Sequence, residues 1–184
     1  MVDQIIQNNA SVLETEINWF CEVLSARIKL HFGEESRIKD IFELEPPPID
    51  KDASTYGNLI DHYQFSPEER IVFILALIPY IKPQILDIFL TTNSGTGNPP
   101  TEFGGKKDPE NSRFNPTIET ALFILAGNDL KSRFSYYHLF DPDHYFTKHN
   151  ILSGKATSHN EYQLNLPLML TSEMIDLITT GRVR

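Results

Sequence analysis

The chain is poor in cysteine and in basic residues. Its 184 residues include one cysteine, Cys21, which excludes an internal disulfide and any metal motif built on paired cysteines. Sixteen lysines and arginines stand against 25 aspartates and glutamates, so the net charge is −9. Proteins that bind nucleic acids or anionic membranes generally need a strongly basic surface. The composition therefore argues against either function as a general property of the chain.

Long apolar runs are missing as well. The stretch Ile71–Ile78 has eight consecutive apolar residues, whereas a helix needs roughly 20 to cross a bilayer. The N-terminus, MVDQIIQNN, lacks the basic stretch followed by an apolar stretch that typifies a secretory signal. We therefore expect a cytoplasmic protein without membrane association. Its 40% of hydrophobic residues is enough to bury a core.

The sequence from Phe65 to Ile78, FSPEERIVFILALI, predicts the central helix of that core. Ser66 is a suitable N-cap, Pro67 suits the first helical position, and Glu69 completes a capping box. The eight apolar residues that follow leave almost no polar face. A helix that is apolar all round belongs in the middle of a core.

A long helix and a linker are expected before this central helix. Val2 to about Phe32 contains neither glycine nor proline, and its apolar residues recur at helical spacing. This stripe suits packing against the rest of the domain, with an oligomer zipper as the alternative. Residues 34–55 are acidic and contain three consecutive prolines, which cannot continue a helix. We therefore divide the chain into an N-terminal helix at 1–33, an acidic proline-rich linker at 34–55 and a domain at 56–181.

Proline and glycine punctuate the chain beyond the central helix. Pro79 is expected to end that helix, and Pro83 to begin another that runs to about Thr91. Residues 93–113 contain four glycines and three prolines and are predicted to form a long flexible loop. Asn115 is then expected to cap a helix that ends at Gly127.

The last third of the chain predicts one more helix, a hairpin and a final helix. Asn128 or Asp129 can cap a helix over 130–140. Residues 162–171 partly alternate polar with apolar side chains, which indicates a small β hairpin with Pro167 at an edge or bulge. Ser172 is expected to cap the last helix, which ends near Gly181.

Three helices followed by a hairpin are typical of a winged-helix fold. We therefore predict a mainly α-helical protein with a small β hairpin, built as a winged-helix-like core preceded by a long N-terminal helix. In a DNA-binding winged helix the third helix, here 130–140, enters the major groove and needs several cations. Between Asp129 and Lys155 there are four lysines and arginines against three aspartates. This balance favours a scaffold or a protein-docking role over DNA binding.

The stretch Gly104-Gly105-Lys106-Lys107 resembles part of a phosphate-binding loop. Such a loop needs a glycine, four residues and then Gly-Lys-Ser/Thr between a strand and a helix. Here Pro100 stands at the first glycine position and Lys107 at the hydroxyl position. The sequence therefore predicts no nucleotide site, and no cofactor, in this chain.

Histidines and acidic residues gather between positions 138 and 149, but no metal site is predicted there. The histidine spacing does not place two imidazoles on one helical turn, and neighbouring aromatic residues favour partly buried, hydrogen-bonded histidines. Asp61-His62 could orient an imidazole, but we identify no nucleophile as its partner. We therefore predict no catalytic and no metal-binding residue.

The candidate partner-binding residues lie on the predicted helix over 130–140. Leu130, Phe134 and Tyr137 share one face of it, and Lys131 and Tyr136 lie on the opposite face with Arg133 to one side. Aromatic side chains with a polar end supply contact area at low entropic cost. The predicted partner-binding residues are Lys131, Arg133, Tyr136 and Tyr137, with ordinary core packing of the aromatic residues as the alternative.

Two long strings of the sequence point to a family. FSPEERIVFILALIPYIKPQILDIFL and FNPTIETALFILAGNDLKSRF, followed by NILSG and LPLMLTSEMIDLITTGR, resemble the N-terminal region of a bacterial AAA+ ATPase family. These ATPases occur with phage-tail-like contractile injection systems, and their N-terminal regions contain a variant winged-helix domain. The resemblance covers roughly Tyr56 to Gly181 and consists of helix patterns instead of catalytic motifs.

The resemblance implies a non-catalytic piece of a longer ATPase. ATP chemistry needs a Walker A loop, a Walker B strand and arginine fingers, which these residues do not contain. ATP and magnesium are then expected only in an ATPase module outside this sequence. The implied role is an adaptor or regulatory domain that binds a protein partner or the substrate of the motor. The alternative is a DNA-binding winged-helix regulator.

Overall fold

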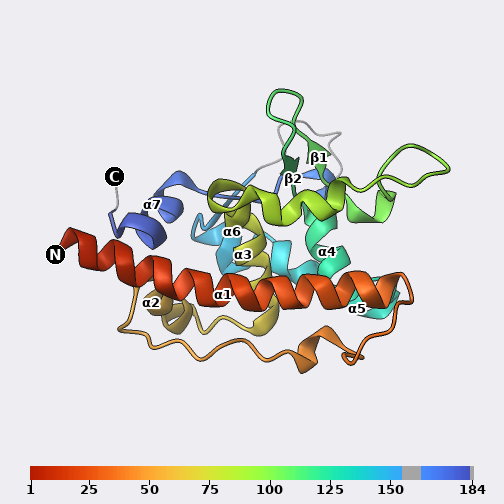
Figure 1. Ribbon diagram of the computed structural model, residues 1–184. Helices are drawn as coiled ribbons and strands as arrows, with labels where there is room; N and C mark the ends of the chain where they lie inside the picture. The colour runs from red at the N-terminus through yellow and green to blue at the C-terminus, as the bar shows by residue number, and fades with distance from the viewer. Residues whose placement is uncertain (155–162, 183–184) are drawn as a thin grey trace. The chain divides into compact units, whose positions relative to one another are not determined.

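A computed structural model describes residues 1–154 and 163–182 of the chain (Figure 1). These residues are mainly helical, with a long N-terminal helix and two small antiparallel hairpins. The mainly helical class, the small hairpin and the long first helix are therefore confirmed, and the winged-helix-like core stays a prediction. The described residues divide into two compact units, and the division falls inside the central helix.

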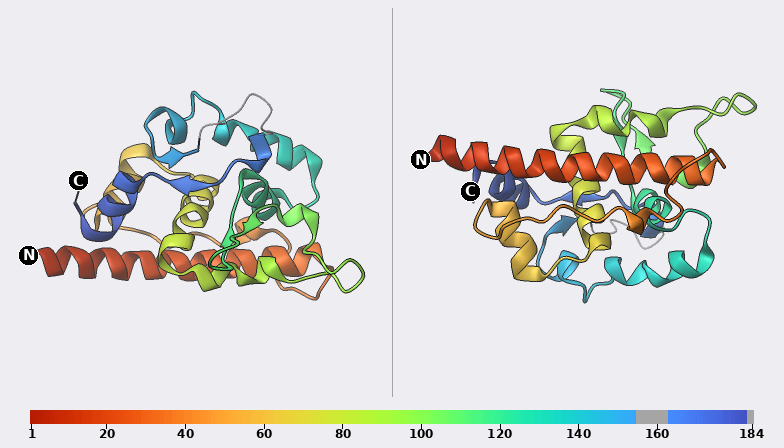
Figure 2. Two further views of the ribbon diagram at one scale, coloured as in Figure 1. Left: turned by 90° about the horizontal axis from the view of Figure 1, so that it is seen from above. Right: turned by 60° about the horizontal axis from the view of Figure 1, so that its bottom comes forward.

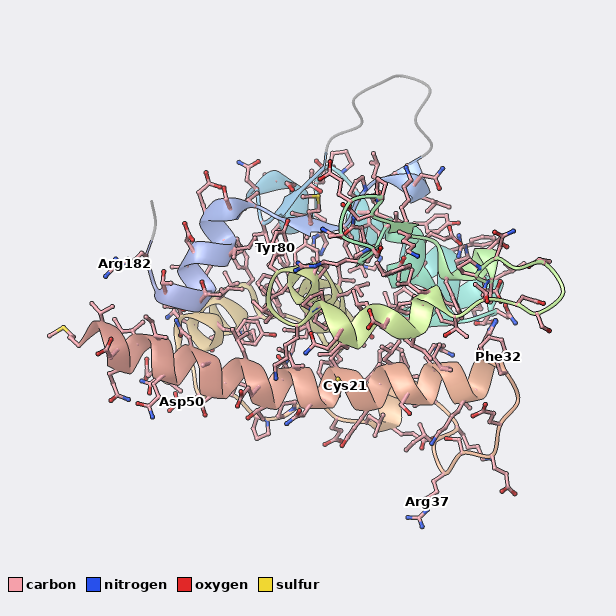
Figure 3. The ribbon with its side chains drawn as sticks, turned by 45° about the horizontal axis from the view of Figure 1, so that its top comes forward. Cys21, Phe32, Arg37, Asp50, Tyr80 and Arg182 are labelled. Carbon is pink, nitrogen blue, oxygen red and sulfur yellow. The ribbon has the colours of Figure 1, made fainter. Side chains whose placement is uncertain are left out.

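Unit 1 comprises Met1–Ile74 and the segment that begins at Thr171. Its helices are α1 (Val2–His31), the 3₁₀ helix η1 (Ile41–Glu43), α2 (Thr55–Tyr63), the first half of α3 (Pro67–Ile81) and α7 (Ser172–Thr180). The chain between α1 and α2 runs back alongside α1, as the views in Figure 1 and Figure 2 agree. Figure 3 shows Arg37 of this segment pointing away from the ribbon.

Asn9 joins three helices of unit 1. It lies one turn before the apolar stripe of α1 begins and is only 1% exposed. Its amide nitrogen donates to the carbonyl of Thr179 in α7, and its amide oxygen accepts the backbone N–H of Thr55 at the start of α2. The Thr55 hydroxyl in turn donates to the carbonyl of Leu177. These hydrogen bonds hold both α1 and α7 to the start of α2, and they give the buried amide of Asn9 its partners.

A buried ion pair lies deeper in unit 1. Glu16 is fully buried, and Arg70 donates to it from Nε at 2.8 Å and from Nη2 at 2.7 Å. The hydroxyl of Tyr56 also donates to Glu16, and burial is the main cause that raises the pKa of Tyr56 well above its usual value. The Arg70 guanidinium lies over the ring of Trp19 at 5.6 Å. A charge taken out of water needs this kind of complete pairing.

The segment over 34–54 is held by its backbone carbonyls. Trp19 Nε1 donates to the carbonyl of Leu44 at 2.9 Å, and Arg70 Nη2 donates to the carbonyl of Pro47 at 2.8 Å. Ile41 in η1 is 1% exposed and supplies an apolar contact. The acidic proline-rich segment therefore has a defined path although most of it lies outside regular secondary structure.

α3 begins as the sequence predicts and ends later. The Glu69 backbone N–H donates to Ser66 Oγ at 3.2 Å, and Ile71–Ile78 have no exposed surface. The expectation that Pro79 ends the helix is wrong, since α3 continues to Ile81. Pro79 removes one backbone N–H, but the Lys82 N–H closes the last turn on the carbonyl of Ile78 at 2.9 Å. The helix ends just before Pro83, whose ring disfavours helical geometry in the preceding residue.

Unit 2 comprises Leu75–Leu170, within which 155–162 lie outside the described residues. After α3 come the 3₁₀ helices η2 (Pro83–Leu90) and η3 (Thr101–Phe103), strands β1 (Lys106–Lys107) and β2 (Phe114–Asn115), and α4 (Ile118–Ala126). The remaining elements are α5 (Leu130–Ser135), η4 (Tyr137–Phe140), α6 (Tyr145–Lys148), β3 (Leu152–Ser153), η5 (Gln163–Asn165) and β4 (Met169–Leu170).

Each hairpin of unit 2 has two short antiparallel strands. Lys106 pairs with Asn115 and Lys107 with Phe114 in the first, and β3 pairs with β4 in the second. The second hairpin includes part of the predicted one; Tyr162, the first residue of that prediction, lies outside the described residues. Pro167 forms an isolated antiparallel bridge with Thr117, as the expected edge position allows.

The structure differs from the expected loop over 93–113 in two places. η3 buries Phe103, whose ring lies 5.2 Å from that of Phe89, and β1 begins at Lys106. Sequence periodicity misses both elements because each is only two or three residues long. Gly105 at φ +72° is needed here, since a Cβ at this position would lie 2.2 Å from the Phe114 ring.

Threonines cap two helices at which we expected other residues. Thr117 is the N-cap of α4 and forms a reciprocal capping box with Thr120, whereas Asn115 lies in β2. Thr171 caps α7 by accepting the Met174 N–H, one residue before the expected Ser172. Gly127 and Gly181 end these two helices as predicted. The errors are of one or two residues because several adjacent polar side chains can cap a helix.

Across the described ranges, no single helix is both long and apolar enough to cross a membrane. α3 and η2 together reach the required length and composition, but they are bent by 103° at the break between them.

Candidate functional site

The four predicted partner-binding residues lie together on α5 and the turn that follows it. Asp129 caps α5 as predicted, with its side chain accepting the backbone N–H of Ser132. Hydrogen bonds from the hydroxyl and the backbone N–H of Ser132 lower the pKa of Asp129 below its usual value. The predicted single helix over 130–140 is wrong in extent, because α5 ends at Ser135 and a 3₁₀ turn, η4, begins at Tyr137.

The apolar face of this segment is exposed. Leu130 is 62% exposed, Phe134 57% and Tyr137 39%, and α5 has no buried residue. The rings of Phe134 and Tyr137 lie 5.7 Å apart. We call these three residues the α5 surface. The buried residues of the segment are Leu139 and Phe140 in η4, which are only 1% and 8% exposed. Of the aromatic residues for which core packing was the alternative, Tyr137 is exposed and Tyr136 is half-buried.

Arg133 has a structural partner. Its Nη2 donates to Glu119 of α4 at 2.7 Å, and both side chains are largely covered. This hydrogen bond is the main cause that raises the pKa of Arg133, and a hydrogen bond with Tyr137 acts in the same direction. Arg133 therefore holds α5 against α4 and orients Tyr137. It contributes to the α5 surface mainly by positioning these groups, because its charge is already paired with Glu119.

Lys131 and Tyr136 lie beside the α5 surface. Lys131 is exposed, and Tyr136 is half-buried where the backbone passes from α5 to η4. The structure thus brings all four predicted residues onto one short segment. The structure also adds Leu130 and Phe134 to the candidate site. The sequence places both on one face with Tyr137, but helical periodicity does not say whether an apolar face is covered by other elements.

The histidines nearby make hydrogen bonds. His138 Nδ1 lies 2.6 Å from the carbonyl of Ser135, and His144 Nδ1 accepts the backbone N–H of Phe146 at 3.0 Å. The His138 and His144 rings are 6.4 Å apart. In the part of the chain that the structure describes, no cluster of three histidine, cysteine, aspartate or glutamate side chains could hold a metal ion.

Gly104 and Gly105, in the stretch that resembles part of a phosphate loop, have a packing role. Both have positive φ, and a Cβ on Gly104 would lie 2.5 Å from the Cβ of Glu119. The Gly105 N–H donates to Thr117 Oγ1 at 3.0 Å. The glycines therefore allow the chain to pass close to the start of α4. Lys106 and Lys107 that follow are exposed on β1.

Glu16 and Asn9 are two buried polar residues of α1 that the sequence reasoning missed. Both lie on the covered side of α1, where Glu16 falls three residues after Leu13 and four before Phe20. A polar residue at the helical spacing of an apolar stripe lies on the buried face, and this spacing was the signal that could have identified both residues.

Comparison with known proteins found no matching protein family, no matching curated protein and no matching solved structure.

Proposed function

We propose that this chain is a non-catalytic docking domain that binds a protein partner through the α5 surface. The observation that carries the proposal is the exposure of Leu130, Phe134 and Tyr137 within eight residues. Apolar anchors at positions i, i+4 and i+7 are typical of contacts between a helix and a groove in a partner. Large apolar side chains gathered on one exposed segment are a recurrent mark of protein interaction sites.

The pairing of Arg133 supports protein docking over DNA binding. A helix that reads DNA presents several cations to the phosphates and bases. On α5 the charge of Arg133 is directed to Glu119 at 2.7 Å, which leaves Lys131 as the exposed cation of this six-residue helix. The exposed apolar side chains of the same segment, Leu130, Phe134 and Tyr137, suit a protein groove better than a phosphate backbone.

The resemblance supplies the class of partner. In this proposal the domain belongs to a bacterial AAA+ ATPase in the cytoplasm and positions the motor on a component or substrate of a contractile injection system. ATP and magnesium act in an ATPase module that is separate from these residues. The domain contributes binding and the transmission of conformational change, and it makes or breaks no covalent bond.

Co-sedimentation with purified contractile injection particles tests this proposal. We expect the chain to pellet with the particles and the double variant Leu130→Ser/Phe134→Ser to stay in the supernatant. Ile88→Ser is the matched control, because Ile88 is a similarly apolar side chain of unit 2, 41% exposed on η2, and lies outside the α5 surface. The control should pellet like the unmodified chain.

Two results would contradict the proposal. One is equal pelleting of the double variant and the unmodified chain. The other is tight binding to duplex DNA that falls steeply between 50 and 200 mM salt, on the order of 10³-fold or more, and is lost in Lys131→Ala. The second result would establish the DNA-binding regulator instead.

A further inference from the structure

Two hollows lie in unit 2 on either side of Lys106. The first has a volume of about 390 Å³, and Tyr80, Pro116 and Met169 are among its lining residues. The second has a volume of about 580 Å³, and its lining includes Phe89 and Pro100. Lys106, Thr117 and Asn165 line both hollows, so the two share a common edge.

Backbone hydrogen bonds hold that common edge in place. The Leu168 N–H donates to the carbonyl of Pro116 at 2.9 Å, and the Ile118 N–H donates to the carbonyl of Leu166 at 3.2 Å. Thr117 forms a bridge with Pro167 between these two bonds. The walls are therefore preformed, which reduces the entropic cost of binding.

The first hollow has exposed apolar side chains at the surface. Tyr80, the last aromatic residue of α3 and labelled in Figure 3, is 44% exposed, and Met169 on β4 is 42% exposed. Both line the first hollow. Tyr80 and Met169 are among the few large apolar side chains that are exposed in the described residues, and both border this cavity.

The charge around the hollows is opposite to that of the whole chain. Their linings contain Lys106, Lys107 and Arg113 and one acidic residue, Asp108, in a chain whose net charge is −9. Asp108 already accepts the backbone N–H groups of Glu110 at 2.8 Å and Asn111 at 3.2 Å. The lining thus contains more cationic than acidic side chains, beside a first hollow whose walls are mostly apolar.

We propose that these hollows bind an extended, acidic segment of a partner protein. An apolar side chain of that segment occupies the first hollow, and a carboxylate pairs with Lys106 at the edge that the two hollows share. Alternate residues of an extended chain point to the same side, so the matching pattern is an apolar residue and an acidic residue two positions apart. Charge complementarity selects an acidic segment, and the apolar walls of the first hollow select its apolar side chain. This site is separate from the α5 surface and does not depend on the proposed function.

Selection from a random nine-residue peptide library displayed on phage, against the immobilised chain, provides the probe. We expect enrichment of peptides in which an acidic residue has an apolar residue two positions away. Enrichment of basic peptides, or no enrichment of this pattern, would overturn the inference.

Fluorescence anisotropy of the most enriched labelled peptide then locates the site. Lys106→Glu should weaken binding at least tenfold. Lys131→Glu is the matched control, because it makes the same charge change at another exposed lysine of unit 2 and should alter binding less than twofold. Equal weakening by both variants would mean that only the overall charge matters, and it would overturn the inference.

Two more measurements complete the test. The double variant Leu130→Ser/Phe134→Ser should bind the peptide as tightly as the unmodified chain, and loss of binding in this variant would place the peptide on the α5 surface instead. In the unmodified chain, the peptide should shift backbone amide NMR signals over 105–117 and 165–169. Shifts confined to 130–137 would overturn the inference without any substitution that could affect folding.

Discussion

Replacing Arg70 by methionine should strongly destabilise unit 1. Arg70 makes two hydrogen bonds to Glu16 and one to the carbonyl of Pro47, all between 2.7 and 2.8 Å. Methionine keeps much of the apolar volume but none of these donors. The Glu16 carboxylate would then stay fully buried with Tyr56 as its remaining hydrogen-bond donor among the contacts described above.

The expected loss follows from this burial. The side chains of Arg70 and Glu16 are 9% and 0% exposed, so water cannot replace the missing partner. Removing one member of a buried ion pair costs about 3–5 kcal/mol. With a urea dependence of about 2 kcal/mol per molar, the unfolding midpoint should fall by about 2 M.

Tryptophan fluorescence during urea unfolding measures this change directly. Trp19 is the one tryptophan of the chain, and it lies in unit 1 beneath the Arg70 guanidinium. Arg133→Met is the matched control, since it breaks the less completely buried pair with Glu119 in unit 2 and should cost less than the loss of the Arg70–Glu16 pair. If Arg70→Met moves the midpoint of the Trp19 signal no further than Arg133→Met does, the reasoning about the buried pair is refuted.

Three further substitutions test other features of the fold. The folded state raises the pKa of Tyr56, so the contribution of Tyr56 to stability is complete below about pH 10 and is lost as the pH rises further. Tyr56→Phe should flatten this alkaline decline in stability, measured by urea titrations that follow Trp19 fluorescence. An unchanged decline would contradict the pKa shift. Thr117→Ala should cost about 1 kcal/mol or more in thermal unfolding followed by circular dichroism because α4 loses its cap, whereas Thr117→Ser should restore most of the loss. Gly105→Ala should lower the melting temperature more than Gly97→Ala, since both have positive φ but only Gly105 brings a Cβ against the Phe114 ring; equal effects would show that this close approach is not limiting.

Sequence reasoning succeeds where local signals are strong. The long stretch without glycine or proline predicts α1 to within one residue of its end at His31. The Ser66 cap and the apolar run that follows correctly predict the start of α3 and the complete burial of Ile71–Ile78. These features depend on hydrogen bonds and side-chain spacing within one segment, so the sequence of that segment contains the information.

It fails where distant residues decide the outcome. The face of Leu130 and Phe134 has the spacing of a buried stripe, yet no element in the described residues covers it. Glu16 looks like a surface residue until Arg70, more than fifty positions away, is brought beside it. For the candidate site, the sequence identifies the segment, and only the tertiary structure identifies which side faces water.

The segment over 34–54 has a consequence for how the sequence can change over time. The backbone carbonyl oxygens of Leu44 and Pro47 accept hydrogen bonds from the side chains of Trp19 and Arg70. Every amino acid has such an oxygen. Substitutions in this segment can therefore accumulate while its course along α1 is preserved, provided that the two donors and the buried Ile41 remain. Related chains should vary at most of these positions and keep a tryptophan and an arginine at the two donor positions, so a stretch that looks poorly conserved would still follow the same path.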